Sequence, residues 1–112
     1  MLAYDEDLIE RAIAEGLPQW TDHTIIDPEE FREVLARIRE EGLAHDWEEN
    51  TVGLSCVAIP IFARSPVPVA AMSVSGPTEL FRPEEHIPAL RKISSAASRA
   101  YIARIDLETL TA

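Results

Sequence analysis

The residue types most able to do chemistry gather in one stretch of the sequence, between Asp46 and Pro77. This stretch holds an acid, Asp46, the only cysteine, Cys56, and two serines, Ser73 and Ser75. Side chains alternate between the two faces of a strand, so Ser73 and Ser75 share a face. If Cys56 points to the same side, the three form a small polar patch on an apolar surface, which is how sites for small ligands are usually built.

Such a patch suits a small carboxylate, because hydroxyls and backbone N–H groups hold an anion without a full positive charge. Asp46 fits less simply, since two carboxylates repel each other. It can accept a hydrogen bond from a ligand hydroxyl, or become protonated if it is removed from water. Plainer interpretations stay open: Asp46 as a solvated acid at a strand start, Cys56 as a buried inert thiol, and Ser73 and Ser75 as hydroxyls at a strand end.

A catalytic interpretation makes Cys56 a nucleophile or redox centre. It requires a base near the thiol, and only His23, His45 or His86 could supply one. The same residues show neither the C-x-x-C nor the H-x-x-x-H spacing of a metal site. The sequence therefore predicts no metal and no cofactor.

Length and charge narrow the class of protein. The 112 residues suit one domain, and 20 acids against 10 bases give a net charge of −10. Such a chain repels nucleic-acid phosphates overall, so we expect no DNA-reading module in it. It has neither a secretory signal nor an apolar run of membrane-spanning length, and one cysteine cannot form an internal disulfide. These features favour a cytoplasmic protein without a membrane partner.

The N-terminal half reads as two helices joined by an ordered loop. Residues Asp5 to Glu15 have helical spacing. Residues Leu17 to Ile26 form the loop, which we expect Trp20 to pin to the body. The second helix begins after Asp27, a good N-cap followed by proline, and ends at Gly42, the expected left-handed C-cap.

The pattern then changes to that of strands, over Leu43 to Glu49, Val52 to Ala63 and Val67 to Ser75. The break at Arg64-Ser65-Pro66 makes the last two a hairpin. Proline cannot donate to a ladder, so Pro60 and Pro68 should lie at an edge, at a bulge or with the N–H side facing outward.

A last helix should run from about Pro88 to Ala103, after a short turn at Pro83 to His86, because Pro88 would break the first turns of a longer helix. The tail from Asp106 is expected to fray. The expected inward positions of this helix are Leu90, Ile93, Ala97, Ala100 and Tyr101. Together the elements predict an α/β fold of the α+β type, with an antiparallel sheet of at least three strands and helices packed on it.

Four pieces of sequence carry a resemblance to a known family. They are G-L-P-Q-W-T with T-I-I-D-P (residues 16–28), R-I-R-E-E-G-L-A-H-D-W-E-E-N (37–50), G-L-S-C-V-A-I-P-I-F (53–62) and M-S-V-S-G-P (72–77). In this order and spacing, the chain resembles the effector-binding domain of IclR-type transcriptional regulators, from about Leu2 to about Ala103.

The resemblance implies a GAF/PAS-like fold that is incomplete relative to the family. Residues 1–105 would be a partial effector-binding domain and 106–112 a C-terminal tail, without the family's winged helix-turn-helix head and first strands. The implied partners are a small organic or aromatic acid, further copies in a dimer or tetramer, and DNA only through the missing head. The implied effector contacts are Asp46, Cys56, Ser73, Ser75 and the backbone of Gly53, Leu54 and Ser55.

Three functions remain open at this point. The first is a ligand-sensing and oligomerising domain of a regulator. The second is a GAF-like enzyme using Cys56. The third is a non-sensing remnant that only associates with other subunits. The absence of the family's first strands would leave an exposed sheet edge, which invites pairing with another chain.

Overall fold

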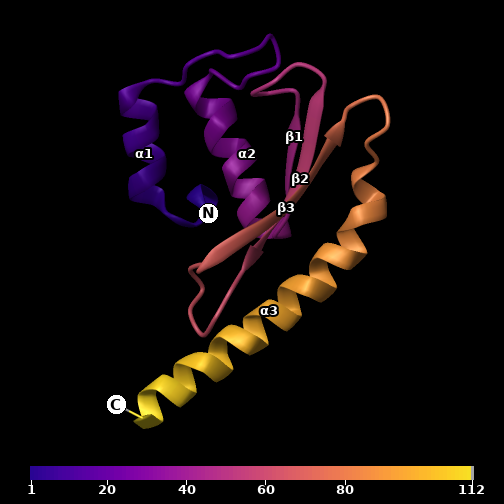
Figure 1. Cartoon of the computed structure of the whole chain (residues 1–112). Coiled ribbons are helices and arrows are strands. Elements are labelled where there is room, and N and C mark those ends of the chain that lie inside the picture. The colour runs from indigo at the N-terminus through magenta and orange to yellow at the C-terminus, as the bar shows by residue number, and fades with distance from the viewer. Residues whose placement is uncertain (112) are drawn as a thin grey trace.

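The computed structural model describes residues 1–111, whose strands form one antiparallel sheet in the order β1-β2-β3. Its elements are η1 (Leu2–Tyr4), α1 (Glu6–Glu15), α2 (Pro28–Glu41), β1 (Ala44–Trp47), β2 (Leu54–Ile61), β3 (Ala70–Pro77) and α3 (Pro83–Thr111). Figure 1 shows α1 and α2 side by side on one side of the sheet, and α3 running obliquely along the other. The predicted α+β class is confirmed.

Local capping explains why the first two helices begin and end where they do. The Asp5 carboxylate accepts the Leu8 N–H at 3.1 Å, and the Asp27 carboxylate accepts the Glu30 N–H at 2.9 Å. Gly42 closes α2 at a φ of 66°, in the left-handed region that glycine tolerates without strain. The predicted ends of α2 are therefore confirmed.

Two separate apolar clusters hold the elements together. The first lies between the sheet and α3: Val57, Ile59, Phe81 and Leu90. The second lies among η1, α1 and α2: Ala3, Ile9 and Leu35. Tyr4 reaches from the second cluster to the sheet, where its ring packs edge-on against Phe62 with 5.4 Å between the ring centroids. The α1–α2 layer is thus a unit of its own, attached to the sheet at few points.

The hairpin of β2 and β3 differs from its predicted limits. β3 begins at Ala70 rather than Val67, because Pro66 and Pro68 have no N–H to add to the ladder. It also extends past Ser75 to Pro77, and the Thr78 N–H continues the pairing with Gly53 O at 2.9 Å.

Pro60 lies inside β2 without interrupting it. The pairing of β1 with β2 ends at Ala44 opposite Ala58, so nothing on the β1 side requires an N–H from Pro60. This agrees with the predicted outward-facing position.

α3 is one continuous helix, which corrects the prediction of a separate turn before Pro88. Pro83 is the first helical residue, so Pro88 lies near the start and removes a single intrahelical hydrogen bond. The helix also continues to Thr111 through the segment expected to fray. Arg64 from the β2–β3 connection holds this end with two hydrogen bonds to Asp106, at 2.6 and 2.7 Å.

Two serine hydroxyls fix α3 to β2 in addition to the packing of Leu90. Buried Ser94 donates to Pro60 O at 3.0 Å, and Ser98 donates to Phe62 O at 2.5 Å. Ile93 and Tyr101, which were expected to face inward, are 50% and 43% exposed. Leu90 is buried as predicted.

No helix within residues 1–111 is both long enough and apolar enough to cross a membrane.

The Ser94 contact yields a stability prediction. Ser94→Ala leaves the buried Pro60 carbonyl without its donor, so we expect unfolding free energy to fall by about 1–3 kcal/mol. Ser95→Ala, one residue along on the exposed side of α3, is the matched control and should change stability by less than about 0.5 kcal/mol. Urea unfolding followed by circular dichroism measures both. Equal stability of the two variants would contradict the assigned role of the Ser94 hydroxyl.

Candidate ligand-binding site

The register of the sheet brings the predicted polar residues to one face. Asp46 on β1 lies opposite Cys56 on β2, Cys56 lies opposite Ser75 on β3, and Ser73 lies opposite Ala58. Directly opposed residues of antiparallel strands point to the same side of a sheet. Asp46, Cys56, Ser73 and Ser75 therefore share the face that α3 does not cover.

This shared face is open only in part. Ser73 and Ser75 are exposed, whereas Asp46 and Cys56 are half-buried. The neighbouring residues of the same face are small, and Met1, Tyr4 and Ile38 of the N-terminal layer line a hollow of about 30 Å³ together with them: Ala44, Ala58 and Ala71. The four side chains thus form the floor of the candidate site.

A hollow of about 340 Å³ lies elsewhere, between α2 and β1. Its lining includes His45 and Trp47, whose rings stack with centroids 6.4 Å apart. His45 lies opposite Val57, so both rings are on the α3 side of the sheet. This hollow is separate from the face that carries Asp46 and the two serines.

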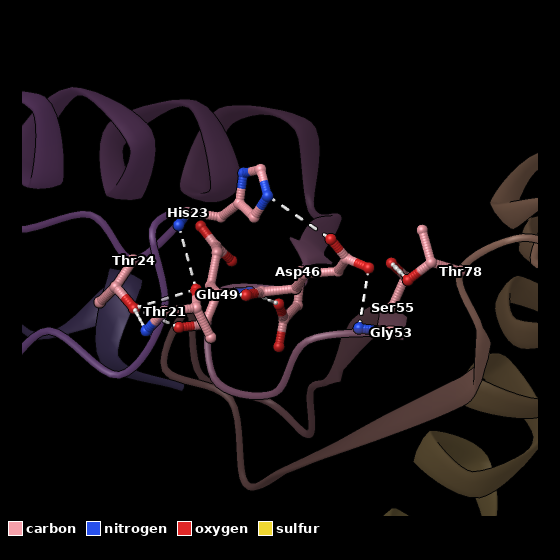
Figure 2. A network of polar contacts seen from close by, with 9 residues as sticks. Thr21, His23, Thr24, Asp46, Glu49, Gly53, Ser55 and Thr78 are labelled. Carbon is pink, nitrogen blue, oxygen red and sulfur yellow. Dashed lines mark hydrogen bonds and ion pairs between the residues drawn. The ribbon is translucent and has the colours of Figure 1, made fainter.

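The backbone donors expected at Gly53, Leu54 and Ser55 have partners within the protein. The Leu54 N–H donates to Thr51 O at 3.2 Å, and Gly53, at a φ of 82°, donates to the Glu48 carboxylate at 2.8 Å. The Ser55 side chain is fully buried on the opposite face, bonded to the Thr78 hydroxyl at 2.8 Å. Figure 2 shows the Ser55–Thr78 pair and the Gly53 nitrogen beside it.

The Glu48 carboxylate is the hydrogen-bond acceptor of the Gly53 N–H. One carboxylate oxygen accepts that N–H, and the other lies 3.5 Å from Nε2 of His23. The Glu48 backbone adopts a φ of 57°, which is uncommon for a residue with a side chain. The Gly53 N–H therefore binds a carboxylate in this structure, but one from the protein itself.

Asp46 also has an internal partner. Its Oδ1 accepts the Glu49 N–H at 2.8 Å, which fixes the turn after β1. Burial raises the pKa of the Glu49 carboxyl above its ordinary value, and the negative charge of Asp46 and a hydrogen bond to it raise the pKa further. The acidic end of the candidate site is thus a close pair of carboxyl groups.

Two threonines dock the loop between α1 and α2 onto this turn. The Thr21 hydroxyl donates to Glu48 O at 2.5 Å, and the Thr24 hydroxyl donates to Glu49 O. Trp20, which was predicted to pin the loop, is 69% exposed. The prediction missed the T-x-x-T spacing, which is typical of hydroxyls that bond to nearby backbone groups.

The histidines available to a catalytic Cys56 have other neighbours. His86 stacks on Phe81 at 5.3 Å between ring centroids, on the α3 side of the sheet, and His23 lies beside Glu48. His45 points to the face opposite Cys56. Among residues 1–111, no group of three or more potential ligands is arranged to hold a metal ion.

Comparison with known proteins decides the family. Residues 1–103 match the family described as "Bacterial transcriptional regulator IclR C-terminal". The chain belongs to the IclR family. Over 62 residues it is 47% identical to the regulator BhcR of Paracoccus denitrificans, which covers 55% of this chain and 22% of BhcR. The regulator KdgR of Escherichia coli is 40% identical over 82 residues, or 67% of this chain and 31% of KdgR.

Solved IclR-family structures have the same fold. The C-terminal domain of E. coli KdgR aligns with a TM-score of 0.76 and 33% identity, covering 88% of this chain and 63% of that domain. The inducer-binding domain of PobR from Acinetobacter, solved with 3-hydroxybenzoic acid, aligns with a TM-score of 0.75 and 26% identity, covering 84% of this chain and 57% of that one. The chain spans less than a third of the curated relatives BhcR and KdgR.

The threonine contacts predict a specific local effect. Thr24→Val removes the hydroxyl that donates to Glu49 O and accepts the Trp20 and Thr21 N–H groups, so the loop should detach from the β1–β2 turn. We expect faster amide hydrogen exchange in residues 17–26 and a loss of about 1–2 kcal/mol of stability. Thr109→Val, at an exposed position of α3, is the control. Unchanged exchange in residues 17–26 would contradict the docking role.

The raised pKa of Glu49 predicts that the stability of the protein depends on pH, and that Glu49→Gln stabilises it at neutral pH. Between the ordinary value of 4.5 and the higher value in the folded protein, the folded state holds a proton that the unfolded chain has lost. Stability therefore falls as pH rises through this window. Glu49→Gln keeps a donor without the charge, so it should be more stable than wild type at pH 7, by less than about 1 kcal/mol.

Thermal unfolding at several pH values measures this effect. The gain of Glu49→Gln should vanish as the pH falls below 4.5, where Glu49 is protonated in both states. Glu33→Gln, at an exposed position of α2, is the matched control and should show no comparable trend. A gain that is constant from pH 4 to 7 would show that the charge of Glu49 is not its cause.

Proposed function

We propose that this chain is the effector-binding and oligomerising domain of an IclR-family transcriptional regulator. It binds a small organic or aromatic acid in the cytoplasm and has no catalytic role. Binding modulates the affinity for DNA of a winged helix-turn-helix domain that lies outside these 112 residues. The observation that carries the proposal is the register that places Asp46, Cys56, Ser73 and Ser75 on one face.

The inducer-binding domain of PobR supports the choice of ligand class, since it was solved with a hydroxylated aromatic acid. Ser73 and Ser75 supply exposed hydroxyls that can donate hydrogen bonds to a ligand carboxylate. The half-buried side chain of Cys56 lies between these serines and Asp46 and offers a polarisable surface for the ligand to pack on. The acidic pair Asp46 and Glu49 suits a ligand hydroxyl, because a carboxylate accepts the hydrogen bond that such a hydroxyl donates.

Ligand binding at this face would reach the loop between α1 and α2. That loop is held by Thr21 and Thr24 to the turn that contains Glu48 and Glu49. A ligand carboxylate that takes the Gly53 N–H displaces Glu48, which changes the partner of His23 in the same loop. A ligand that prefers one arrangement of this loop over another shifts the population toward it.

The test is thermal unfolding with a panel of small carboxylic acids, including 3-hydroxybenzoate, pyruvate and glyoxylate. A ligand at about 100 times its Kd stabilises a domain by about 2.7 kcal/mol, which raises Tm by several degrees. We expect one class of acid to raise Tm, and the double variant Ser73→Ala with Ser75→Ala to bind it at least about tenfold more weakly, since it loses hydrogen bonds to a charged group.

Ser95→Ala is the control for the loss of a hydroxyl elsewhere, and it should bind as wild type does. An acid that raises the Tm of the double variant as much as that of wild type does not bind at this face. A cooperative transition that no acid moves would favour a domain that only associates with other subunits.

A further inference from the structure

The face of the candidate site changes from polar to apolar in the same direction on all three strands. An alanine lies two residues from each of three polar residues, and therefore on the same side of the sheet: Ala44 from Asp46, Ala58 from Cys56 and Ala71 from Ser73. Residues two apart in a strand are separated by about 6.6 Å, so one short molecule can reach both sets. The candidate site thus has an apolar end as well as a polar one.

The hollow of about 30 Å³ lies at this apolar end. Its lining joins the three alanines of the sheet to Tyr4 of η1, Ile38 of α2 and Met1. Apart from the Tyr4 hydroxyl, these side chains are apolar. An apolar group of a ligand therefore gains free energy when it leaves water for this hollow.

The Tyr4 ring is held in place by two sets of contacts. It packs edge-on against Phe62, with 5.4 Å between the ring centroids, and it also packs against the apolar cluster of the N-terminal layer. Ile38 packs against that same cluster. Tyr4 and Ile38 therefore cannot move away from the sheet to enlarge the hollow without breaking apolar contacts.

The size of the hollow restricts what it can hold. A volume of about 30 Å³ corresponds to one water molecule, whereas a protein cavity that binds benzene has about 150 Å³. A neighbouring segment of a longer chain would narrow this hollow rather than widen it, because the walls named above are already in place. The hollow thus admits the methyl end of a short aliphatic acid, but not an aromatic ring.

We infer that Tyr4 determines the size specificity of the acid site, because with Ile38 and the three alanines it limits the ligand group at the apolar end to about the size of a methyl. The favoured ligands are aliphatic acids of about three or four carbons, with the carboxylate at Ser73 and Ser75 and the methyl end in the hollow. The inference rests on the proposed function, since it presupposes an acid held by these serines. It narrows the ligand class of that function to short aliphatic acids.

Calorimetric titration of the full chain with two straight-chain series tests the inference. The series are 2-hydroxy acids and 2-oxo acids of two to six carbons, and 3-hydroxybenzoate is the aromatic probe. For wild type we expect the tightest binding at three or four carbons, and at least about tenfold weaker binding of the six-carbon acids and of 3-hydroxybenzoate. Tyr4→Ala removes a wall of the hollow, so it should shift the preference toward the six-carbon acids and 3-hydroxybenzoate by at least about tenfold.

Three further variants separate ligand selection from folding. Tyr4→Phe keeps the ring and loses only the hydroxyl, so it should rank the acids as wild type does. Ala71→Val narrows the hollow from the sheet side with a residue that suits a strand, and it should move the preference to two-carbon acids. Ala70→Val adds the same two methyl groups on the opposite face of β3 and should keep the wild-type ranking. Ala71→Val keeps the test decisive if Tyr4→Ala does not fold.

The ranking of the acids, rather than the affinity for any one of them, decides the outcome. Tighter binding of 3-hydroxybenzoate than of every aliphatic acid by wild type would contradict the size limit. If the Tyr4 and Ala71 variants weaken all acids by the same factor, these residues do not select the ligand, and the proposed function stands without the inference. If no acid of any class binds to wild type, the proposed function and the inference both fail.

Discussion

The pairing of β2 with a neighbour on each side is the constraint on which the candidate site depends. Cys56 lies opposite Asp46 on one side and opposite Ser75 on the other, so these side chains meet only because both registers hold. A slip of one residue in either pairing would send one strand's polar groups to the face covered by α3. Met72 and Val74 of β3 pack against the buried cluster of Val57 and Ile59, so they oppose a slip of β3 because it would move them off that cluster.

Hydroxyl groups connect the less regular parts of the chain to this sheet. Ser94 and Ser98 hold α3 to the end of β2, and Thr21 and Thr24 hold the α1–α2 loop to the turn after β1. In each case the acceptor is a backbone carbonyl. Small polar side chains thus add to the apolar packing of Leu90 against Val57 and Ile59.

This pattern also explains how far the sequence predicts the structure. The limits of α2 follow from Asp27 and Gly42, whose effects are local, and the shared face of Ser73 and Ser75 follows from strand alternation. The predictions made for Trp20 and Pro88 were wrong because the roles of these residues depend on their positions in the tertiary structure. Trp20 lies outside the packed region, and Pro88 falls early enough in α3 for the helix to tolerate it.

The IclR-type motif of residues 53–62 predicts the fold more firmly than it predicts the partners of its own backbone groups. The fold and the family that it implied are confirmed. The donors that it implied at Gly53 and Leu54 are engaged within the protein, and the Ser55 hydroxyl faces the other side. Resemblance transfers backbone geometry well, but the current partner of each backbone group depends on neighbours such as Glu48 that the motif does not include.

The position of Glu48 on the Gly53 N–H has a consequence for the affinity of any acid that binds there. Glu48 precedes Gly53 by only five residues. Its carboxylate therefore competes with a bound acid for the Gly53 N–H within the same chain, at an effective concentration in the millimolar range or above. The apparent dissociation constant of an acid at that N–H therefore exceeds its intrinsic dissociation constant, because the acid must first displace the Glu48 carboxylate. Removing the Glu48 carboxylate would tighten the binding of every acid that uses this donor, whatever the rest of its structure.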